Sequence, residues 1–486
     1  MERSTENDLL VEKIVGRLSL EKRVSAATWS IDRRSRGSSM KFKIKFNYWF
    51  VFTVVILMVS PASLAQTEAG NAFTEESWNA KFQTTVIWQD KPSFTSPYTG
   101  VNSLYPDTRG AYSITGTAFL GARAWKSAEF YFNVEMISAV PFSNLHGLGG
   151  LTNSEQQKTS GARPNFYIAR EFLRQTFLLG GDKVQLSSGP NQMASEVEKR
   201  RFVLTLGRFA ILDVFDTNAY AHDGRTQFSN WAFFTFGAFD YAADTRGYSV
   251  GVAVELYYDD WVFRFGRFEG PEQSNGFALD SDLIHHYGDQ LEIEHAHILF
   301  NQAGKLRILG FRNQEVMGKF SDANTLSLVS GDVPEVADVR KLQTKLGWGA
   351  SFEQGLCDML GMFARASFSD GQTETYTFTE IESSLAAGIV AKGHSWRRDL
   401  DTLGLAFAQN GLGLTHQTYL SKGGVGAFLG DGQLRYAPER IIDSYYNFNI
   451  FQNTFFGPGI QYILNPGYNA DRGPVIVGML RVHSDF

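Results

Sequence analysis

A cluster of polar side chains with aromatic neighbours occupies the stretch from Asp213 to Trp231. Hydroxyl-rich solutes need both hydrogen-bond donors and acceptors, and an aromatic ring can stack on their apolar faces. The polar candidates are Asp213, Asp216, Asn218, His222, Asp223, Arg225 and Asn230, and the aromatic candidates are Tyr220 and Trp231. We interpret the stretch as a candidate binding segment. The alternatives are a solvated loop and, for Trp231, a place in an interfacial aromatic belt.

Other residue patterns give little support to catalysis or metal binding. The sequence contains no H-E-x-x-H zinc motif and no phosphate-binding G-x-x-x-x-G-K motif. One metal-like cluster combines His285, His286, His295 and His297 with Glu292 and Glu294. On a strand, His295 and His297 face away from both glutamates, so one metal ion cannot readily take all four side chains. We therefore expect no enzyme activity, no metal site and no cofactor.

Most of the chain around this stretch is predicted to form β-strands, because apolar and polar residues alternate with a period of two from Ser77 onward. The run 78–89 alternates in this way and has Trp at both edges of its apolar face. The runs 114–124 and 130–136 repeat the pattern. The segment 248–265 indicates a hairpin that turns at Asp259-Asp260 and places Tyr248 on the apolar face. The alternation is lost after Phe209, which indicates a loop there.

The first 65 residues are predicted to be an export signal and not part of the fold. Lysines precede an apolar stretch at 49–59, and small residues follow up to Ala65. This pattern is typical of a cleaved secretory signal peptide at 40–65, with an N-terminal anchor as the alternative. We predict that 1–39 is an extension upstream of the true start at Met40, and that 66–486 is the β-domain.

Composition and charge narrow the class of protein further. Aromatic residues make up 14 % of the 486 residues, with 40 Phe, and Gly counts 47, which favours sheet. The single cysteine, Cys357, excludes an internal disulfide, and we expect it to be a small buried hydrophobe. Residues 66–486 hold 34 Lys and Arg against 45 Asp and Glu, a net charge of −11. This acidic balance argues against a nucleic-acid partner.

Periodicity alone does not distinguish a soluble β-sandwich from a membrane β-barrel. The export signal, the aromatic residues at strand ends and the alternation of tight turns with long polar connections favour the barrel. Among the long connections we count 139–165 and 185–200, which are predicted to be extracellular. The sequence thus predicts an all-β transmembrane antiparallel barrel with short periplasmic turns and long extracellular loops. Its place would be the outer membrane of a Gram-negative bacterium, among outer-membrane lipid and lipopolysaccharide.

The C-terminus supports the barrel. Gly478, Leu480, Val482 and Phe486 share one parity, and the chain stops on Phe486. A final strand that ends on an aromatic residue is typical of outer-membrane barrels and resembles the signal that the barrel-assembly machinery binds. Ser484 departs from the hydrophobic residue that is usual at this parity.

Long segments of the chain also resemble the carbohydrate-selective porins of the OprB type. The most specific runs from Leu206 to Asp223 as LGRFAILDVFDTNAYAHD and continues with FSNW at 228–231. The segments 88–98, 237–244 and 461–469 are similar as well, whereas Gly224 stands where relatives often carry Pro. The resemblance covers nearly the whole mature chain. It implies a monomeric barrel of about sixteen strands that passes glucose-like mono- or oligosaccharides.

Such a pore needs charged and amide groups at its constriction, and residues of inward parity supply them. Arg123 and Glu135 lie on neighbouring strands, and Glu255 and Arg264 lie on the next clear hairpin. We expect the 213–230 stretch to fold inward and to narrow the pore together with Arg123 and Glu135. Replacing Asp216 or Arg123 should then leave barrel stability unchanged, because lumen positions are expected to face water.

Two other functions remain open at this point. One is a barrel channel for another solute, such as organic acids or an exported polysaccharide. The other is a soluble secreted carbohydrate-binding β-protein.

Overall fold

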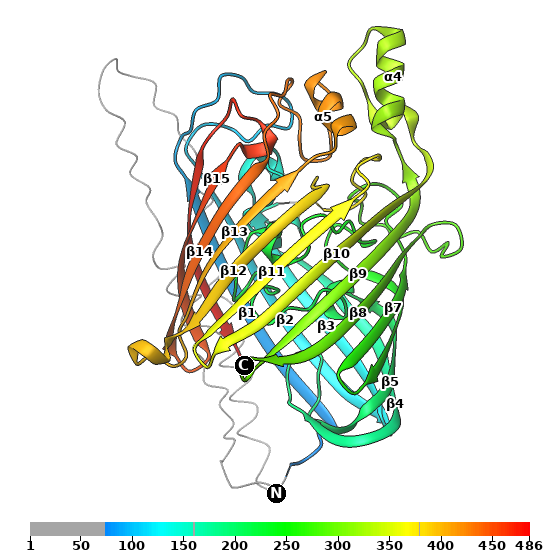
Figure 1. Ribbon diagram of the computed structural model, residues 1–486, viewed down its shortest axis with the longest axis vertical. Helices are drawn as coiled ribbons and strands as arrows, with labels where there is room; N and C mark the ends of the chain where they lie inside the picture. Colours follow the sequence, from blue (N-terminus) through cyan, green and yellow to red (C-terminus); the bar gives the residue numbers. More distant parts are fainter. Residues whose placement is uncertain (1–72, 159–160, 379) are drawn as a thin grey trace, which may run out of the picture. The chain divides into compact units, whose positions relative to one another are not determined.

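The computed structural model describes residues 73–158, 161–378 and 380–486. Within them, sixteen antiparallel strands form one closed barrel, in which each strand pairs with its sequence neighbours and the last pairs with the first (Figure 1). The strands are β1 Trp78–Lys91, β2 Arg109–Trp125, β3 Ala128–Val140, β4 Asn165–Leu186, β5 Ser195–Phe209, β6 Ser249–Tyr258, β7 Trp261–Phe268, β8 Tyr287–Leu299, β9 Gln302–Met317, β10 Lys341–Cys357, β11 Leu360–Ser369, β12 Ser383–Lys392, β13 Thr402–Gly411, β14 Glu439–Phe451, β15 Thr454–Leu464 and β16 Val475–Asp485. This confirms the predicted fold class. The predicted extension at 1–39 and signal peptide at 40–65 lie outside the described residues.

Between residues 73 and 486, the helices that the structure describes are short and lie in the connections. They are α3 Trp231–Phe234, α4 Phe320–Ser330 and α5 Leu414–Ser421, with 3-10 turns η2 Phe142–Leu145, η3 Ser154–Lys158, η4 Ile211–Asp213, η5 Val336–Val339, η6 Gly393–Trp396 and η7 Pro466–Tyr468. In the described part of the chain, no helix has the length and apolar character to cross a membrane.

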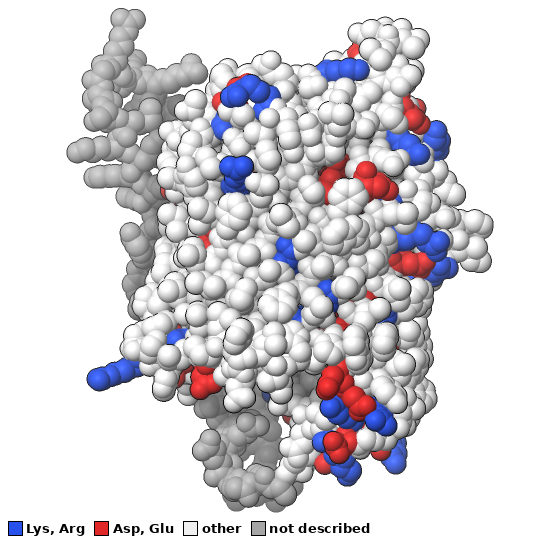
Figure 2. Space-filling model, in the orientation of Figure 1, with Lys and Arg blue, Asp and Glu red and all other residues white. Residues whose placement is uncertain are grey.

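The two faces of the wall differ as the alternation predicts. On β1, Trp78 exposes 69 % of its surface outward and Phe82 is also exposed, whereas Gln89 of the opposite parity is buried. Thr117 on β2 and Glu135 on β3 are buried in the same way. In the view of Figure 2, uncharged residues form most of the wall, and the largest group of charged side chains lies near one end of the strands. An apolar outer face over a polar lumen is the arrangement of a membrane barrel.

The barrel closes where β16 pairs with β1. Phe486 and Phe82 exchange two backbone hydrogen bonds, at 2.8 and 3.0 Å, and their rings stack at 6.3 Å. Ser484, which departs from the apolar parity, is buried and its Oγ lies 3.0 Å from Thr454 Oγ1 of β15. A hydroxyl pair between neighbouring strands thus satisfies the polar group at this position.

Short and long connections lie at opposite ends of the barrel, as expected for periplasmic turns and extracellular loops. At the inner, periplasmic end, Asp259-Asp260 joins β6 to β7 with Asp259 at φ +56°. Cys357 ends β10 at the same end and is exposed, so the expectation that it is buried is wrong. It pairs with Leu360 of β11 after a register shift at Gly355, next to the short turn that joins the two strands.

The prediction that 185–200 is an extracellular connection is also wrong. Leu186 and Ser195 are still paired as parts of β4 and β5, and the eight residues between these strands connect them at the inner end. The segment lacks an apolar parity, because this end of the hairpin does not belong to the lipid-facing wall. Polar residues on both faces therefore concealed a strand pair.

Loops from the outer end fill part of the lumen. Aromatic residues of 210–248 pack with inward side chains of the wall, among them Phe215, Trp231, Phe236, Phe239 and Tyr241 against Tyr131, Phe172, Phe209, Phe268 and Phe311. Tyr248 precedes β6 and is buried inside the barrel, where its hydroxyl donates to Glu135 at 3.1 Å. Its predicted place on the outer apolar face is therefore wrong, because the strand begins one residue later.

Candidate functional site

The connection between β5 and β6, residues 210–248, leaves the wall and folds into the lumen. A buried ion pair holds it there: Asp216 is 0 % exposed, and its Oδ1 accepts from Nε of Arg365 on β11 at 3.0 Å. The other carboxylate oxygen accepts from Thr235 Oγ1 at 2.8 Å and from the Phe236 backbone N–H at 2.7 Å. The loop is thus tied to the far wall of the barrel and to itself, which confirms the inward fold and excludes the solvated outer loop.

Arg365 binds further parts of the same loop. Its guanidinium donates to the carbonyls of Ala221 at 2.6 Å and Phe233 at 2.7 Å. The premise that lumen positions face water therefore does not hold at Asp216. Removal of Asp216 should therefore destabilise the docked loop, because a buried cation would lose its counter-charge.

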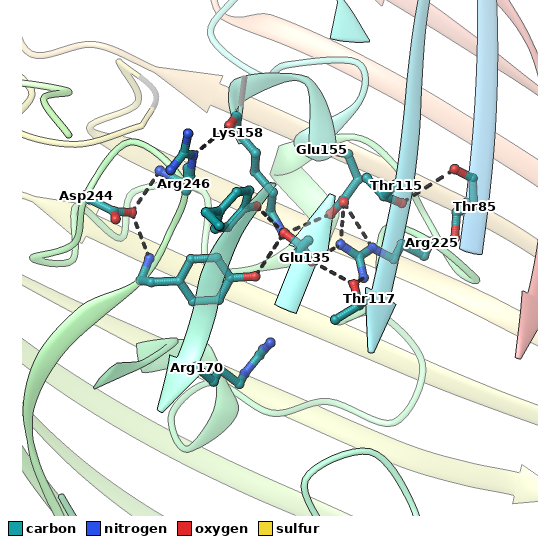
Figure 3. A network of polar contacts seen from close by, with 12 residues as sticks. Thr85, Thr115, Thr117, Glu135, Glu155, Lys158, Arg170, Arg225, Asp244 and Arg246 are labelled. Carbon is teal, nitrogen blue, oxygen red and sulfur yellow. Dashed lines mark hydrogen bonds and ion pairs between the residues drawn. The ribbon is translucent and has the colours of Figure 1, made fainter. Parts of the chain in front are cut away.

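A second network joins the loop to β2, β3 and the connection 141–164 (Figure 3). Arg225 donates to Glu135 Oε2 of β3 at 2.6 Å, to Glu155 Oε2 at 2.7 and 2.9 Å, and to Thr117 Oγ1 of β2 at 3.0 Å. Lys158 Nζ lies 3.4 Å from each glutamate. Two cations and two carboxylates therefore share one compact site, in which the planar guanidinium group of Arg225 donates to both carboxylates.

The charge state of this network follows from its partners. Burial opposes the charged forms, but Glu155 and Glu135 hold the pKa of Arg225 well above its ordinary value. For Lys158, burial is likewise outweighed by Glu135 and Glu155, which raise the pKa of the ammonium group. Both side chains are therefore cations across the physiological pH range.

Polar and aromatic side chains surround this network. Tyr167 and Tyr248 both donate their hydroxyls to Glu135 Oε1. The Arg246 guanidinium lies 4.1 Å from the Tyr167 ring centroid and donates to the carbonyl of Lys158 at 3.2 Å. Nearby, Asp213 accepts two hydrogen bonds of 2.6 Å from Arg170 of β4.

The charged groups and Tyr248 line a cavity of about 360 Å³, together with further aromatic rings. Trp231 is 2 % exposed and stacks on Phe378 with ring centroids 4.8 Å apart, and Tyr241 lies 4.4 Å from Phe378. Trp231 thus lies inside the barrel, and the alternative that it belongs to an outer aromatic belt is wrong. Asp223 and His222 line the cavity from the loop.

The remaining polar residues of the stretch shape the loop. Asn218 Oδ1 accepts from the backbone N–H groups of Tyr220 and Ala221, and Asn230 Oδ1 accepts from Ala232 N at 3.0 Å as the N-cap of α3. Asp223 accepts from the Arg225 backbone at 2.9 Å. Side-chain caps of this kind fix turns within irregular backbone.

The structure separates Arg123 from Glu135. Arg123 lies near the inner end of β2, where it donates to Ser195 Oγ at 2.8 Å and approaches Glu129 at 3.8 Å. Glu255 and Arg264, on neighbouring strands, form an ion pair at 3.0 Å. All three predicted residues line a second cavity, of about 690 Å³, and not the one at Glu135.

Several residues of the site were not predicted. Glu155 and Lys158 come from the connection that was expected to be extracellular, and Arg170 and Arg365 come from distant strands. The inward parity of Arg170 and Arg365 marks them as lumen residues, but nothing local in the sequence indicates which loop atoms they contact.

Two other patterns have structural roles. Among the described residues, no group of three or more His, Cys, Asp or Glu is arranged to hold a metal ion. Glu292 of the metal-like cluster instead accepts from the Asp216 N–H and pairs with Arg264, each at 2.8 Å.

Residues 247–251 have the G-x-S-x-G spacing that is found around the nucleophile of many hydrolases. Ser249 begins β6 and donates to the carbonyl of Glu269 at 2.7 Å, so it does not lie in the strand-to-helix elbow of a hydrolase.

A closed sixteen-strand barrel with an apolar outer face and a lumen narrowed by inward loops defines a porin. The family model described as "Carbohydrate-selective porin, OprB family" matches residues 121–486, and the chain belongs to this family. It is an outer-membrane protein of a Gram-negative bacterium, and its family consists of channel proteins.

One solved structure shares the fold. The high-pH structure of Pseudomonas putida OprB has 16 % identity and a TM-score of 0.64, with 86 % of this chain and 100 % of that chain covered. The low-pH structure of the same porin has 12 % identity and a TM-score of 0.47, with 84 % and 93 % covered. Pseudomonas aeruginosa OccK2 has 8 % identity and a TM-score of 0.42, with 84 % and 97 % covered. The comparison with curated protein sequences gives no significant match.

Proposed function

We propose that the cavity at the constriction admits small neutral carbohydrates, about one sugar ring at a time. The observation that carries the proposal is the lining, which offers carboxylate acceptors in Asp213 and Asp223, cationic donors in Lys158 and Arg246, and the partly exposed ring of Phe234 beside the buried Trp231. A saccharide presents hydroxyls at its edge and an apolar face, so it can use both kinds of surface. The volume of about 360 Å³ lies at the small end of the range of about 300–1,000 Å³ for ligand pockets.

The charge balance supports neutral sugars over the alternative solutes. An organic acid would favour unpaired cations, whereas Arg225 and Lys158 share Glu135 and Glu155. An exported polysaccharide would need a wide lumen along the whole barrel, but aromatic residues of 210–248 fill much of the interior.

Uptake into proteoliposomes tests the proposal. We expect glucose to enter faster than a trisaccharide and faster than a monocarboxylate of similar size. Asp213→Ala should reduce the preference for glucose over the monocarboxylate, because it frees Arg170 from its counter-charge. Asp260→Ala, on an exposed inner turn, is the matched control. Uptake that depends only on solute mass in the parent protein would contradict the proposal.

We further propose a route of export and assembly, and a monomeric state. The signal peptide at 40–65 would be cleaved after Ala65, and Phe486 would bind the barrel-assembly machinery. Each barrel carries its own constricting loops, which supports a monomer. N-terminal sequencing of the mature protein should begin at Gln66, and light scattering in detergent should give the mass of one chain.

A further inference from the structure

The hairpin of β4 and β5 differs from the other inner turns. Its pairing shifts register on both sides of Gly180, and Gly180 and Gly181 have φ of +97° and +93°. Positive φ values of this kind favour glycine and allow a sharp change of direction. Beyond this bend, pairing continues from Lys183 with Glu198 to Leu186 with Ser195, and Figure 1 shows the two strands bending across the inner end.

The tip of this hairpin, residues 187–194, is held by inward residues of β1, β3 and β4. Asn79 of β1 donates to the Gln192 carbonyl at 3.0 Å, and Asn133 of β3 donates to Asn191 Oδ1 at 2.7 Å. Arg174 of β4 donates to the Asn191 carbonyl at 2.9 Å. These donors belong to the lumen face, so the tip lies inside the barrel.

Apolar packing fixes the tip as well. Met193 is 0 % exposed and belongs to the cluster that contains Tyr131 and Phe172. The Tyr131 hydroxyl accepts from the Met193 N–H at 3.1 Å, and Glu76 accepts from the Ala194 N–H at 2.8 Å. A buried anchor and several hydrogen bonds make the tip a built part of the lumen.

The tip lies between the two lumen cavities. Of the residues that the structure describes, four line both the cavity of about 360 Å³ at the constriction and the cavity of about 690 Å³ toward the inner end. They are Pro190 and Asn191 of the tip and Asp213 and His222 of the outer loop. The junction of the cavities is therefore built from both ends of the barrel.

The chemistry of this junction suits hydroxyl groups. Asp213 offers acceptor oxygens, and the Asn191 amide offers N–H donors. His222 Nδ1 is buried without a hydrogen-bond partner among the described residues. Burial lowers the pKa of His222, so its imidazole is neutral at pH 7.

From this placement we propose that Asn191, with Pro190, forms a second, inner filter that a sugar crosses after the loop constriction. The inference rests on the proposed function and extends it to the periplasmic hairpin. A solute would leave the first cavity between the outer loop and this tip, and would exchange hydrogen bonds with Asn191, Asp213 and His222 on the way.

Thiol labelling tests the inner filter. In a Cys357→Ser background, which removes the only cysteine, Asn191→Cys is modified with a bulky neutral methanethiosulfonate. We expect loss of most of the single-channel conductance and of glucose uptake after modification. Ser188→Cys is the matched control: it is exposed on the same tip and lines neither cavity, so its modification should leave both readouts unchanged.

The outcomes separate the two proposals. If the unmodified Cys357→Ser protein takes up no glucose, the proposed function fails, whatever the label does. If it takes up glucose, and labelled Asn191→Cys conducts and transports like the parent, or does not react at all, the inner filter is refuted. Pro190→Cys gives a second, exposed position on the tip should Asn191→Cys not reach the folded barrel.

Discussion

Removing the carboxylate of Asp216 should release the constricting loop while the barrel stays folded. Asp216→Ala takes away the acceptor of Arg365, Thr235 and Phe236, and leaves a buried guanidinium without a counter-charge. Breaking a buried pair by removing one partner costs about 3–5 kcal/mol. Because each 1.4 kcal/mol is a factor of ten, the ratio of undocked to docked loop should rise roughly a hundred-fold to several thousand-fold.

Planar-bilayer recording combined with limited proteolysis measures this effect. We expect larger and noisier single-channel currents, weaker block by glucose, and protease cleavage within 210–248 that the parent resists. The strand ladder is untouched, so the folded protein should still migrate differently on gels before and after heating. Asp216→Asn keeps one acceptor oxygen and should be intermediate, whereas Asp260→Ala should match the parent. Quiet, parent-like currents together with a protease-resistant loop in Asp216→Ala would refute the reasoning.

Three further predictions address charge, pH and assembly. Glu135→Gln removes one of the two carboxylates shared by Arg225 and Lys158, so the reversal potential in a salt gradient should shift toward anion preference; an unchanged potential would mean that ions do not pass this network. His416 on α5 lies 2.7 Å from Glu382 and 3.5 Å from Glu380; burial opposes its charge, but these carboxylates raise its pKa to about 9. The pKa in the unfolded chain is about 6.5, so protonated His416 contributes on the order of 3 kcal/mol to the free energy of unfolding. This stabilisation is fully present below pH 6.5 and is lost as pH rises through about 9. Cleavage within 412–438, by a protease that is active from pH 6 to 10, should therefore increase above pH 9 in the parent and be independent of pH in His416→Gln. A cleavage rate in the parent that does not change with pH would contradict a stabilising role of protonated His416. Phe486→Ser removes the ring that stacks on Phe82 at the closing strands, so the heat-modifiable fraction recovered from the outer membrane should fall, whereas Phe73→Ser, outside the barrel strands, should have no effect.

The wall of the barrel could be predicted because its physical cause is local. Lipid contacts one face of each strand and the lumen contacts the other, so Trp78, Phe82 and Gln89 show their positions through parity alone. The inward loop could be recognised for the same reason, since the alternation stops after Phe209. Where a segment leaves the lipid-facing wall, as at 185–200, parity carries no signal and the prediction was wrong.

The partners within the lumen could not be predicted. Asp216 pairs with Arg365 and Arg225 pairs with Glu135, across separations of 149 and 90 residues. Many inward cations and carboxylates are compatible with the same alternation, and only the path of the loop decides which of them meet. Polar residues that we expected to contact a solute, such as Asn230 and Asp216, therefore hold the loop in place.

The central claim is that carbohydrates enter the constriction and contact its lining. Single-channel current through the parent protein in a planar bilayer, recorded with increasing glucose, tests this most directly. The account predicts block that saturates with glucose concentration and is weakened by Asp213→Ala. A current that falls only in proportion to the viscosity of the solution, equally with glucose and with an inert polyol that is too large to enter the pore, would contradict it.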